Sequence, residues 1–155
     1  MKSGLNYAVA VVLLVTASLA WSAEEEGTLA EYQPVMSEEL KEMLRNASPD
    51  AGKESFMRKC SSCHDHKQKG GHGKGPHLWN IIGRKAGSMP GFTYSDAMRN
   101  SGHTWTLDTL NYYLTKTDRA VPGRIMNFRG IRKDSDRAEL LAFMRMINDN
   151  PPPLP

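Results

Sequence analysis

The sequence has very few cysteines: Cys60 and Cys63 are the only two in 155 residues. Two thiols supply half of a closed zinc site, and His66 and His72 lie at a spacing that suits such a site poorly. A redox dithiol would be expected beside a βαβ pattern, and no such pattern is visible. A disulfide between the two cysteines remains an alternative.

Strand patterns and apolar residues are also scarce. No stretch alternates apolar and polar residues over enough positions to indicate a strand. Apolar residues make up 39% of the sequence, which is low for a chain that builds its core from its own side chains alone. A bound apolar group could therefore supply part of the core of a single domain.

No long apolar run is present beyond the N-terminus. The run from Tyr7 to Leu19 follows Lys2 and precedes small residues, which is typical of a signal peptide. It is shorter than the ~20 apolar residues that a membrane-spanning helix needs. We expect residues 1–23 to be a cleaved signal peptide, with an uncleaved anchor as the alternative. In either case the rest of the chain is expected to lie outside the cytoplasmic membrane.

The charge is divided unevenly along the chain. Residues 24–46 carry seven acidic and two basic residues, a net charge of −5, whereas residues 47–155 carry 17 basic and ten acidic residues, a net charge of +7. We expect residues 24–49 to be an acidic linker with one short helix. That helix is predicted over Glu38 to Arg45, capped by Ser37, and its apolar stripe consists of Leu40, Met43 and Leu44.

The two cysteines belong to a motif for covalent haem attachment. Cys60 and Cys63 lie three positions apart, and His64 follows directly. Where a short helix ends, two side chains at this spacing lie on the same side, so each can bond a vinyl carbon of one porphyrin. The adjacent imidazole can coordinate the iron. The motif predicts one haem c, covalently bound through Cys60 and Cys63, with His64 as an iron ligand.

The haem domain is expected to span residues 50–150. Asp50 is expected to cap a helix that runs to about residue 62, in which Gly52 indicates a close helix crossing. The expected partner is a last helix over 134–148. We expect Met144 and Met146 to be packing residues in that helix. The proline-rich residues 151–155 are predicted to form a stiff coil.

The middle of the haem domain is predicted to be mostly loop. Dense glycines over 67–76 and 82–91 indicate backbone wrapped over a flat object. A short helix is expected over 95–100, closed by Gly102, and another from Thr106 to about residue 116. The predicted fold class is all-α.

The iron needs a sixth ligand or else has an open coordination site. Sequence position and helix packing leave six candidates, which are Met89, Met98, Met126, His72, His77 and His103. Met126 follows a rigid Pro-Gly turn in a non-helical stretch, from which its side chain can be aimed inward. The pattern alone does not decide among the six.

From Gly52 to about Ile147 the chain resembles class I cytochrome c of the mitochondrial type. Besides the haem motif, the segments that agree in order are Gly75-Pro76-His77-Leu78, Ile82-Gly83-Arg84-Lys85-Ala86-Gly87, Pro90-Gly91-Phe92-Thr93-Tyr94-Ser95-Asp96-Ala97, Thr104-Trp105, Pro122-Gly123-Arg124-Ile125-Met126 and Phe128. The resemblance implies the class I cytochrome c fold, with the haem wrapped by helices and long loops. A signal or anchor segment and a short extra helix precede that fold here.

The resemblance implies a role for several residues around the iron. Met126 would be the distal sulfur ligand, so that His64 and Met126 hold the metal. The carbonyl of Pro76 would accept the Nδ1–H of His64 and fix the orientation of the ring. Tyr113 and Phe128 resemble aromatic residues that pack near the methionine ligand.

The resemblance also implies a site for the buried haem propionate. Arg84, Tyr94 and Trp105 resemble residues that donate to this carboxylate, which would otherwise be an unpaired buried charge. Arg124 departs from the family, which usually has threonine there, and Met98 stands where asparagine is common. The family's reduction potential and internal water network therefore do not transfer to this chain.

The haem edge differs from the family as well. Ile125 and Asp118 replace family lysines at this exposed edge. When the chain is aligned with the family, the remaining basic residues on this side are Lys59, Arg119, Arg129, Arg132 and Lys133.

The implied function is a single-electron carrier, not an enzyme, that shuttles electrons between respiratory complexes in the periplasm. A quinol-oxidising complex would be the donor and a terminal oxidase or dehydrogenase the partner, docking on the basic haem edge. A monomer is expected, without nucleic-acid binding and with membrane contact only if the N-terminal segment is retained. The alternative is a membrane-tethered or docked haem subunit of a specific dehydrogenase or oxidase complex. A third hypothesis is a peroxidase whose iron loses Met126.

Overall fold

The computed structural model describes residues 27–155, so the predicted signal peptide or anchor over residues 1–23 lies outside the described residues. Within 27–155 the chain forms helices and loops, without a named strand and with two isolated β-bridges, His64–His72 and Lys85–Thr104. The predicted all-α fold class is confirmed. None of the helices in this part of the chain has the length and apolarity needed to cross a bilayer.

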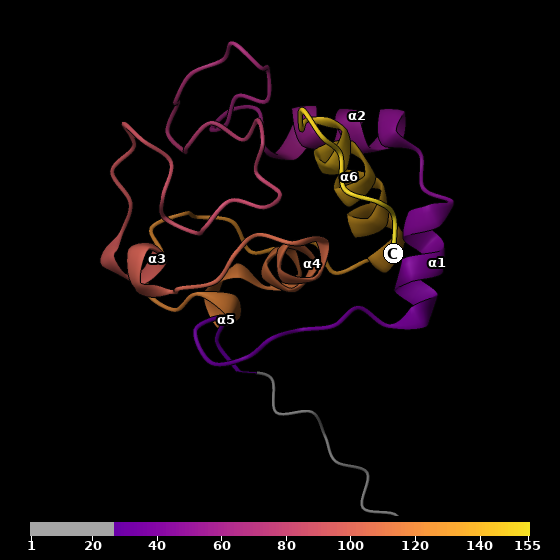
Figure 1. Ribbon diagram of the computed structural model, residues 1–155, viewed down its shortest axis with the longest axis horizontal. Helices are drawn as coiled ribbons and strands as arrows, with labels where there is room; N and C mark the ends of the chain where they lie inside the picture. Colours follow the sequence, from indigo (N-terminus) through magenta and orange to yellow (C-terminus); the bar gives the residue numbers. More distant parts are fainter. Residues whose placement is uncertain (1–26) are drawn as a thin grey trace, which may run out of the picture.

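Helices α2 (Pro49–Lys59) and α6 (Asp134–Met146) form the central helix crossing. Figure 1 shows them side by side at one end of the molecule. At the crossing, a Cβ on Gly52 would lie 2.6 Å from the Glu139 carbonyl carbon and 2.9 Å from Phe143 Cβ. Only a residue without a side chain allows this approach. The crossing that Gly52 indicated is therefore present.

The ends of these two helices differ from the expectation. Ser48 caps α2, because its hydroxyl accepts from Ala51 N–H at 3.3 Å, and Pro49 occupies the first turn. Proline suits that position because its fixed φ is helical and its missing N–H is not needed there. Asp50 is thus inside the first turn instead of capping it. Helix α6 ends at Met146, which is 49% exposed and is not the packing residue expected, whereas Met144 is buried.

Three further helices lie between α2 and α6 in the chain: α3 (Asp96–Asn100), α4 (Leu107–Thr115) and α5 (Thr117–Ala120). The first two agree with the expected helices to within a residue or two. Helix α4 begins with a reciprocal capping box between Thr106 and Thr109. Helix α5 was not expected, because one turn is too short to show an apolar period.

Helix α1 (Glu38–Arg45) begins after Ser37, whose hydroxyl accepts from Leu40 N–H at 3.3 Å, as the sequence predicted. Leu40 and Leu44 are buried and α1 packs against α6. Met43 was assigned to the same stripe, but its side chain is 42% exposed.

Residues 27–46, here called the leader strap, lie against α4, α5 and α6. Leu29 N–H donates to the Ala120 carbonyl at 2.8 Å, and Tyr112 OH donates to the Gly27 carbonyl at 2.6 Å. Further along, Met36 N–H donates to Asp108 Oδ1 at 2.8 Å. Figure 1 shows this segment, in indigo, passing along α5 before it turns up into α1. The sequence did not decide whether the extra helix packs on the domain, and the structure places it there.

The loop after α2 is tied to the end of α6 by Asp149. Its carboxylate accepts from Gln68 Nε2 at 2.9 Å, Trp79 Nε1 at 3.1 Å and Asn80 Nδ2 at 2.5 Å. These hydrogen bonds, the Asn80 and Trp79 side chains first, hold the pKa of Asp149 below its usual value. The loop that carries His64 and Pro76 is thereby fixed at its far end.

Candidate functional site

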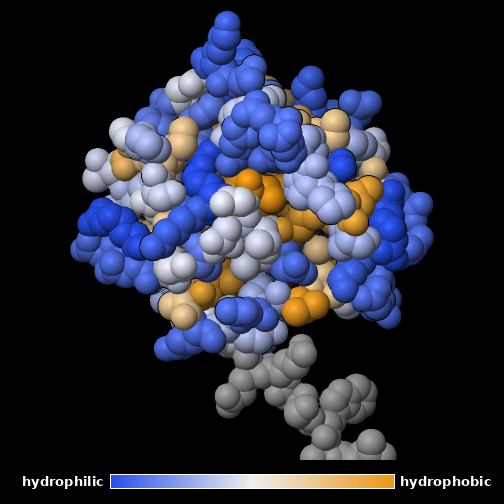
Figure 2. Space-filling model, in the orientation of Figure 1, coloured by the Kyte–Doolittle hydropathy of each residue, from blue (hydrophilic) through white to orange (hydrophobic). Residues whose placement is uncertain are grey.

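A cavity of about 480 Å³ lies between α2, α4, α6 and the loops, with a lining that is mostly apolar. Its size falls in the ~300–1,000 Å³ range of small-molecule and cofactor sites. Nine of the ten site residues expected from the sequence line it: Cys60, Cys63, His64, Pro76, Tyr94, Trp105, Tyr113, Met126 and Phe128. Figure 2 shows apolar side chains gathered in the middle of one face and surrounded by hydrophilic ones.

The end of α2 positions the three residues of the haem motif. Cys60 terminates the helix, and its carbonyl accepts from both Cys63 N–H at 3.0 Å and His64 N–H at 2.9 Å. Cys63 in turn accepts from Gly75 N–H at 2.8 Å. This tight turn places both thiols and the imidazole on the cavity lining, as the spacing indicated.

His64 is oriented by the backbone that follows the glycine-rich loop. Its Nδ1 donates to the Pro76 carbonyl at 2.7 Å, which leaves Nε2 as the nitrogen able to bind a metal. Burial lowers the pKa of His64, and the hydrogen bond to Pro76 opposes that shift. The neutral imidazole, which is the form that binds metals, is thus favoured. A Cβ on Gly75 would lie 2.7 Å from both ring nitrogens, so glycine is required beside the ring.

The two thiols are not bonded to each other in the structure. Burial raises the pKa of Cys60 to about 11, with Lys59 acting in the opposite direction. Among residues 27–155 no cluster of three or more His, Cys, Asp or Glu side chains could hold a metal ion. The disulfide and zinc alternatives therefore gain no support from the described residues.

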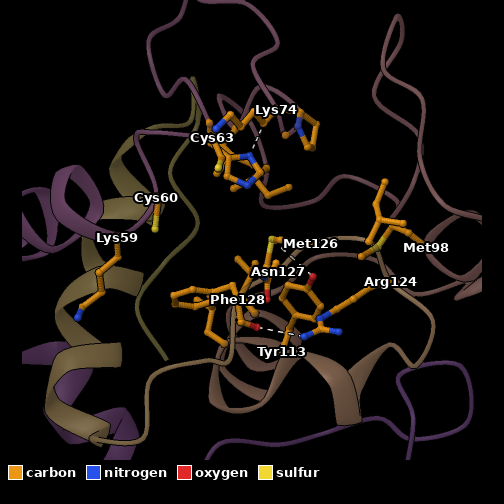
Figure 3. A pocket seen from close by; sticks show the side chains of 18 of the residues that line it. Lys59, Cys60, Cys63, Lys74, Met98, Tyr113, Arg124, Met126, Asn127 and Phe128 are labelled. Atoms are coloured by element: carbon orange, nitrogen blue, oxygen red, sulfur yellow. Dashed lines mark hydrogen bonds between the residues drawn. The ribbon is translucent and has the colours of Figure 1, made fainter.

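Met126 is the candidate distal ligand with the clearest local support. Its sulfur accepts a hydrogen bond from Tyr113 OH at 3.8 Å inside the cavity (Figure 3). Burial raises the pKa of Tyr113 to about 12, so its hydroxyl remains a donor. Of the other five candidates only Met98 lines the cavity. His77 is buried elsewhere, with its Nε2 donating to the Lys67 carbonyl at 2.5 Å.

The three residues expected to bind the propionate are not equivalent. Tyr94 and Trp105 line the cavity, whereas Arg84 does not. The guanidinium of Arg84 donates to the carbonyl of His77 at 2.9 Å and to that of Trp79. Burial lowers the pKa of Arg84, and its interaction with Tyr94 opposes that shift. Arg84 therefore supports the loop and Tyr94 from outside the cavity.

One lining group was not assigned a role from the sequence. Arg124 Nε donates to Thr117 Oγ1 at 2.7 Å, and its Nη2 donates to the Phe128 carbonyl at 3.2 Å. Thr117 Oγ1 also donates to the Phe128 carbonyl. Arg124 was noted as a departure from the family, but nothing in the sequence indicated the fully buried Thr117 as its partner.

The residues present fit a covalently bound haem. The cavity brings together two thiols, one imidazole held in a single orientation and one thioether, which are the groups that attach a haem and ligate its iron. Aromatic and aliphatic side chains supply the apolar walls. Three cationic residues and no carboxylate residue line the cavity in the described chain, which suits a group that carries carboxylates.

Comparison with known proteins supports this assignment. The cytochrome c family model matches residues 49–148. The chain is 38% identical over 133 residues to cytochrome c2 of Rhodomicrobium vannielii, covering 86% of this chain and 91% of that protein. It is 37% identical over 120 residues to a cytochrome c homolog of Bradyrhizobium diazoefficiens, covering 77% of this chain and 65% of that protein. It is also 42% identical over 96 residues to cytochrome c2 of Rhodoblastus acidophilus, covering 62% of this chain and 89% of that protein.

Proposed function

The chain belongs to the cytochrome c family, and from this we propose that it carries single electrons between respiratory complexes in the periplasm. Members of this family carry electrons by means of a covalent haem c and are not enzymes. The predicted fold, cofactor and class of protein are thereby confirmed. The periplasmic location, the respiratory partners and a monomeric state remain part of the proposal.

The meeting of the His64 and Met126 side chains in one apolar cavity carries the proposal. Cys60 and Cys63 would hold the haem, and His64 and Met126 would ligate its iron. Haem c supplies the one-electron redox chemistry, and a thioether ligand favours Fe(II) relative to a second imidazole. Because hydrogen bonds with Pro76 and Tyr113 hold the His64 and Met126 side chains in place, little movement of these two residues would accompany electron transfer.

The mouth of the cavity is the proposed docking surface. Lys59 and Lys74 line the cavity from exposed positions, and Ile125, which also lines it, is 73% exposed. The cations would attract an acidic surface on the partner. Dissolved salt screens this attraction and reduces its range. Ile125 would supply an apolar contact on the same surface. A quinol-oxidising complex as donor and a terminal oxidase as acceptor are the expected partners.

The haem and its ligands are tested on the purified protein. We expect the intact mass to include one covalent haem, and the ferric spectrum to show the weak long-wavelength band of sulfur bound to iron. Replacing Met126 with alanine should remove that band. A colourless polypeptide would refute the cofactor assignment, and an unchanged band in the alanine variant would refute Met126 as ligand.

The carrier role is tested by the oxidation rate of the reduced protein with a terminal oxidase. We expect rapid oxidation that slows steeply as salt is raised from about 10 to 200 mM, because docking relies on screened charges. A rate independent of salt would count against docking through the basic edge.

A second candidate is a membrane-held haem subunit of a dehydrogenase or oxidase complex. Residues 1–23 could serve as an anchor, and the observation that favours it is the packing of the leader strap. Since Leu29 and Gly27 are hydrogen bonded to the haem domain, an anchor preceding them would be joined to the domain by a short connection. Retention of Met1 in the intact mass, together with protein in salt-washed membranes, would replace the diffusible carrier with this candidate.

A further inference from the structure

The shortest helix of the described chain, α5, is followed directly by the loop that carries Met126. It consists of a single turn and begins without a side-chain cap. Such a short helix is unstable on its own, because ordering the first turn costs more than its hydrogen bonds return. The position of α5, and of the loop that follows it, therefore depends on what packs against it. Figure 1 shows the leader strap running along α5.

Hydrogen bonds and a cation–π contact join the strap to α5 and to its neighbour α4. Leu29, whose side chain is buried, donates its N–H at 2.8 Å to the carbonyl of Ala120, the last residue of α5. On α4, Tyr112 OH donates to the Gly27 carbonyl at 2.6 Å. The guanidinium carbon of Arg119, in α5, lies 4.2 Å from the centre of the Tyr112 ring. The strap therefore holds α5 both directly and through Tyr112.

Helix α5 is also tied to residues on both sides of Met126 in the chain. Thr117, fully buried at the start of α5, accepts from Arg124 Nε at 2.7 Å and donates to the Phe128 carbonyl. Arg124 Nη2 donates to the same carbonyl at 3.2 Å. Arg124 stands two positions before Met126, and Phe128 two positions after it. A movement of the loop that withdraws Met126 from the cavity must therefore break these bonds or carry α5 with it.

We propose that the leader strap keeps Met126 on the haem iron by preventing α5 from moving with this loop. This inference rests on the proposed function, in which Met126 is an iron ligand. Tyr112 and Tyr113 are consecutive in α4: the first binds Gly27 of the strap, and the second donates to the Met126 sulfur at 3.8 Å. Leu29 and Tyr112 are positioning residues, since neither lines the cavity and each acts on the ligand through other residues. The strap thus favours electron transfer over the binding of external ligands to the iron.

The experiment measures how tightly added imidazole binds to the purified ferric holoprotein. Imidazole binds the iron only in molecules whose Met126 has left it, so its apparent Kd falls in proportion as the fraction of such molecules rises. Binding is followed by the loss of the sulfur band in the ferric spectrum. The titration is made without denaturant, so it reports the opening of the folded protein and not its unfolding.

Two variants loosen the strap and two serve as controls. Leu29→Ala removes a buried side chain from the strap, and Tyr112→Phe removes only the hydroxyl that binds Gly27. Val35→Ala is the matched control within the strap, because that side chain is 77% exposed. Gly52→Ala controls for overall stability, because it presses a methyl group into the crossing of α2 and α6, two helices that α5 does not contact.

We expect Tyr112→Phe to lower the apparent Kd for imidazole about twofold to tenfold, the range that the loss of one hydrogen bond gives. Leu29→Ala should lower it about tenfold or more, because a buried leucine stabilises more than one hydrogen bond does. Both controls should stay within about twofold of the parent.

An unchanged Kd in either strap variant would overturn the inference, and Tyr112→Phe alone decides if Leu29→Ala does not fold. An equal fall in Gly52→Ala would also overturn it, because the effect would then belong to overall stability. Absence of the sulfur band from the parent protein would instead refute Met126 as a ligand, and with it the proposed function.

Discussion

Gly75 shows how a missing side chain determines the orientation of the His64 ring. Because a Cβ at this position would lie 2.7 Å from both ring nitrogens of His64, the backbone and the imidazole can be in contact only when residue 75 is glycine. The adjacent Pro76 carbonyl then meets Nδ1 at 2.7 Å. The ring orientation therefore depends on two consecutive residues of the loop.

We predict that Gly75→Ala displaces the His64 ring and weakens its bond to iron. The expected results are a lower yield of covalent haem and a ferric spectrum that titrates to high spin at a higher pH than the parent's. Spectra of both proteins recorded between pH 7 and pH 3 provide the measurement. Gly71→Ala is the matched control, since a Cβ there would meet nothing within 4 Å. Equal behaviour of the two variants would contradict the prediction.

His103 is a half-buried histidine whose two ring nitrogens are themselves buried and have no hydrogen-bond partner within the described residues. Its ring packs edge-on against Trp105 with centroids 4.3 Å apart. Burial lowers the pKa of His103 to about 4, opposed by the Ser101 backbone. The unfolded chain, in which histidine has its ordinary pKa of ~6.5, therefore binds a proton more readily.

This difference predicts a loss of stability as the pH falls. A histidine whose pKa is lowered by folding destabilises the folded state between about pH 6.5 and pH 4, because the unfolded state takes up the proton first. The expected loss in the free energy of unfolding is about 1–2 kcal/mol. This is less than the whole pKa difference would give, because the side chain is partly exposed and water screens its charge. His103→Leu should reduce the loss, as measured by denaturant unfolding at pH 7 and pH 4.5. The same loss in both proteins would rule out His103 as a source.

The sequence was sufficient to predict that Cys60, Cys63 and His64 share one site, because they lie within five residues and their spacing brings all three to the cavity lining. The other cavity residues come from distant segments, and the assignment of Met126 among six candidates needed the resemblance to a family. The position of Arg84 outside the cavity could not be predicted, since its partners are backbone carbonyls that carry no sequence signal.

At the scale of elements, helices with a cap and an apolar period were predictable and very short ones were not. Ser37 and Thr106 mark the starts of α1 and α4 where the sequence placed them. The start of α2 was placed two residues late, because Ser48, Pro49 and Asp50 all suit a helix start and only the structure shows which one caps it. Helix α5 has no side-chain cap and one turn, so no pattern indicated it.

The crossing of α2 and α6 gives a prediction at this scale. Gly52→Ala would force a methyl group against the Glu139 backbone and Phe143, neither of which can give way as a flexible side-chain end would. We expect a loss of about 2 kcal/mol or more in the free energy of unfolding, despite the better helix propensity of alanine. Lys53→Ala, an exposed neighbour, should change it by less than about 0.5 kcal/mol. Denaturant unfolding monitored by circular dichroism measures both, and similar values would contradict the predicted close packing.

For the whole molecule, the leader strap is part of the folded domain. Leu29, Met36, Leu40 and Leu44 are buried in the same apolar cluster as Phe56 and Leu140 of the central crossing. The acidic charge of the segment, which suggested a solvated linker, lies on exposed side chains. In the part of the strap before Ser37, the apolar residues are too widely spaced in the sequence for a pattern to indicate their burial.

This packing predicts that the strap and the haem domain unfold together. Leu44, at 1% exposure, lies between α1 and α6, so Leu44→Ala should cost about 2–5 kcal/mol by leaving a cavity. Met43→Ala on the exposed side of α1 is the matched control and should cost less than about 0.5 kcal/mol. Unfolding is followed by two signals. The haem absorbance reports the site around Met126, and circular dichroism reports all of the helices. If the Leu44 variant lost helical signal in a separate early step while the haem signal kept the parent's midpoint, the strap would be an independent attachment. If both signals of the Leu44 variant instead change together, at a midpoint below the parent's, the strap stabilises the haem site from the opposite side of α6.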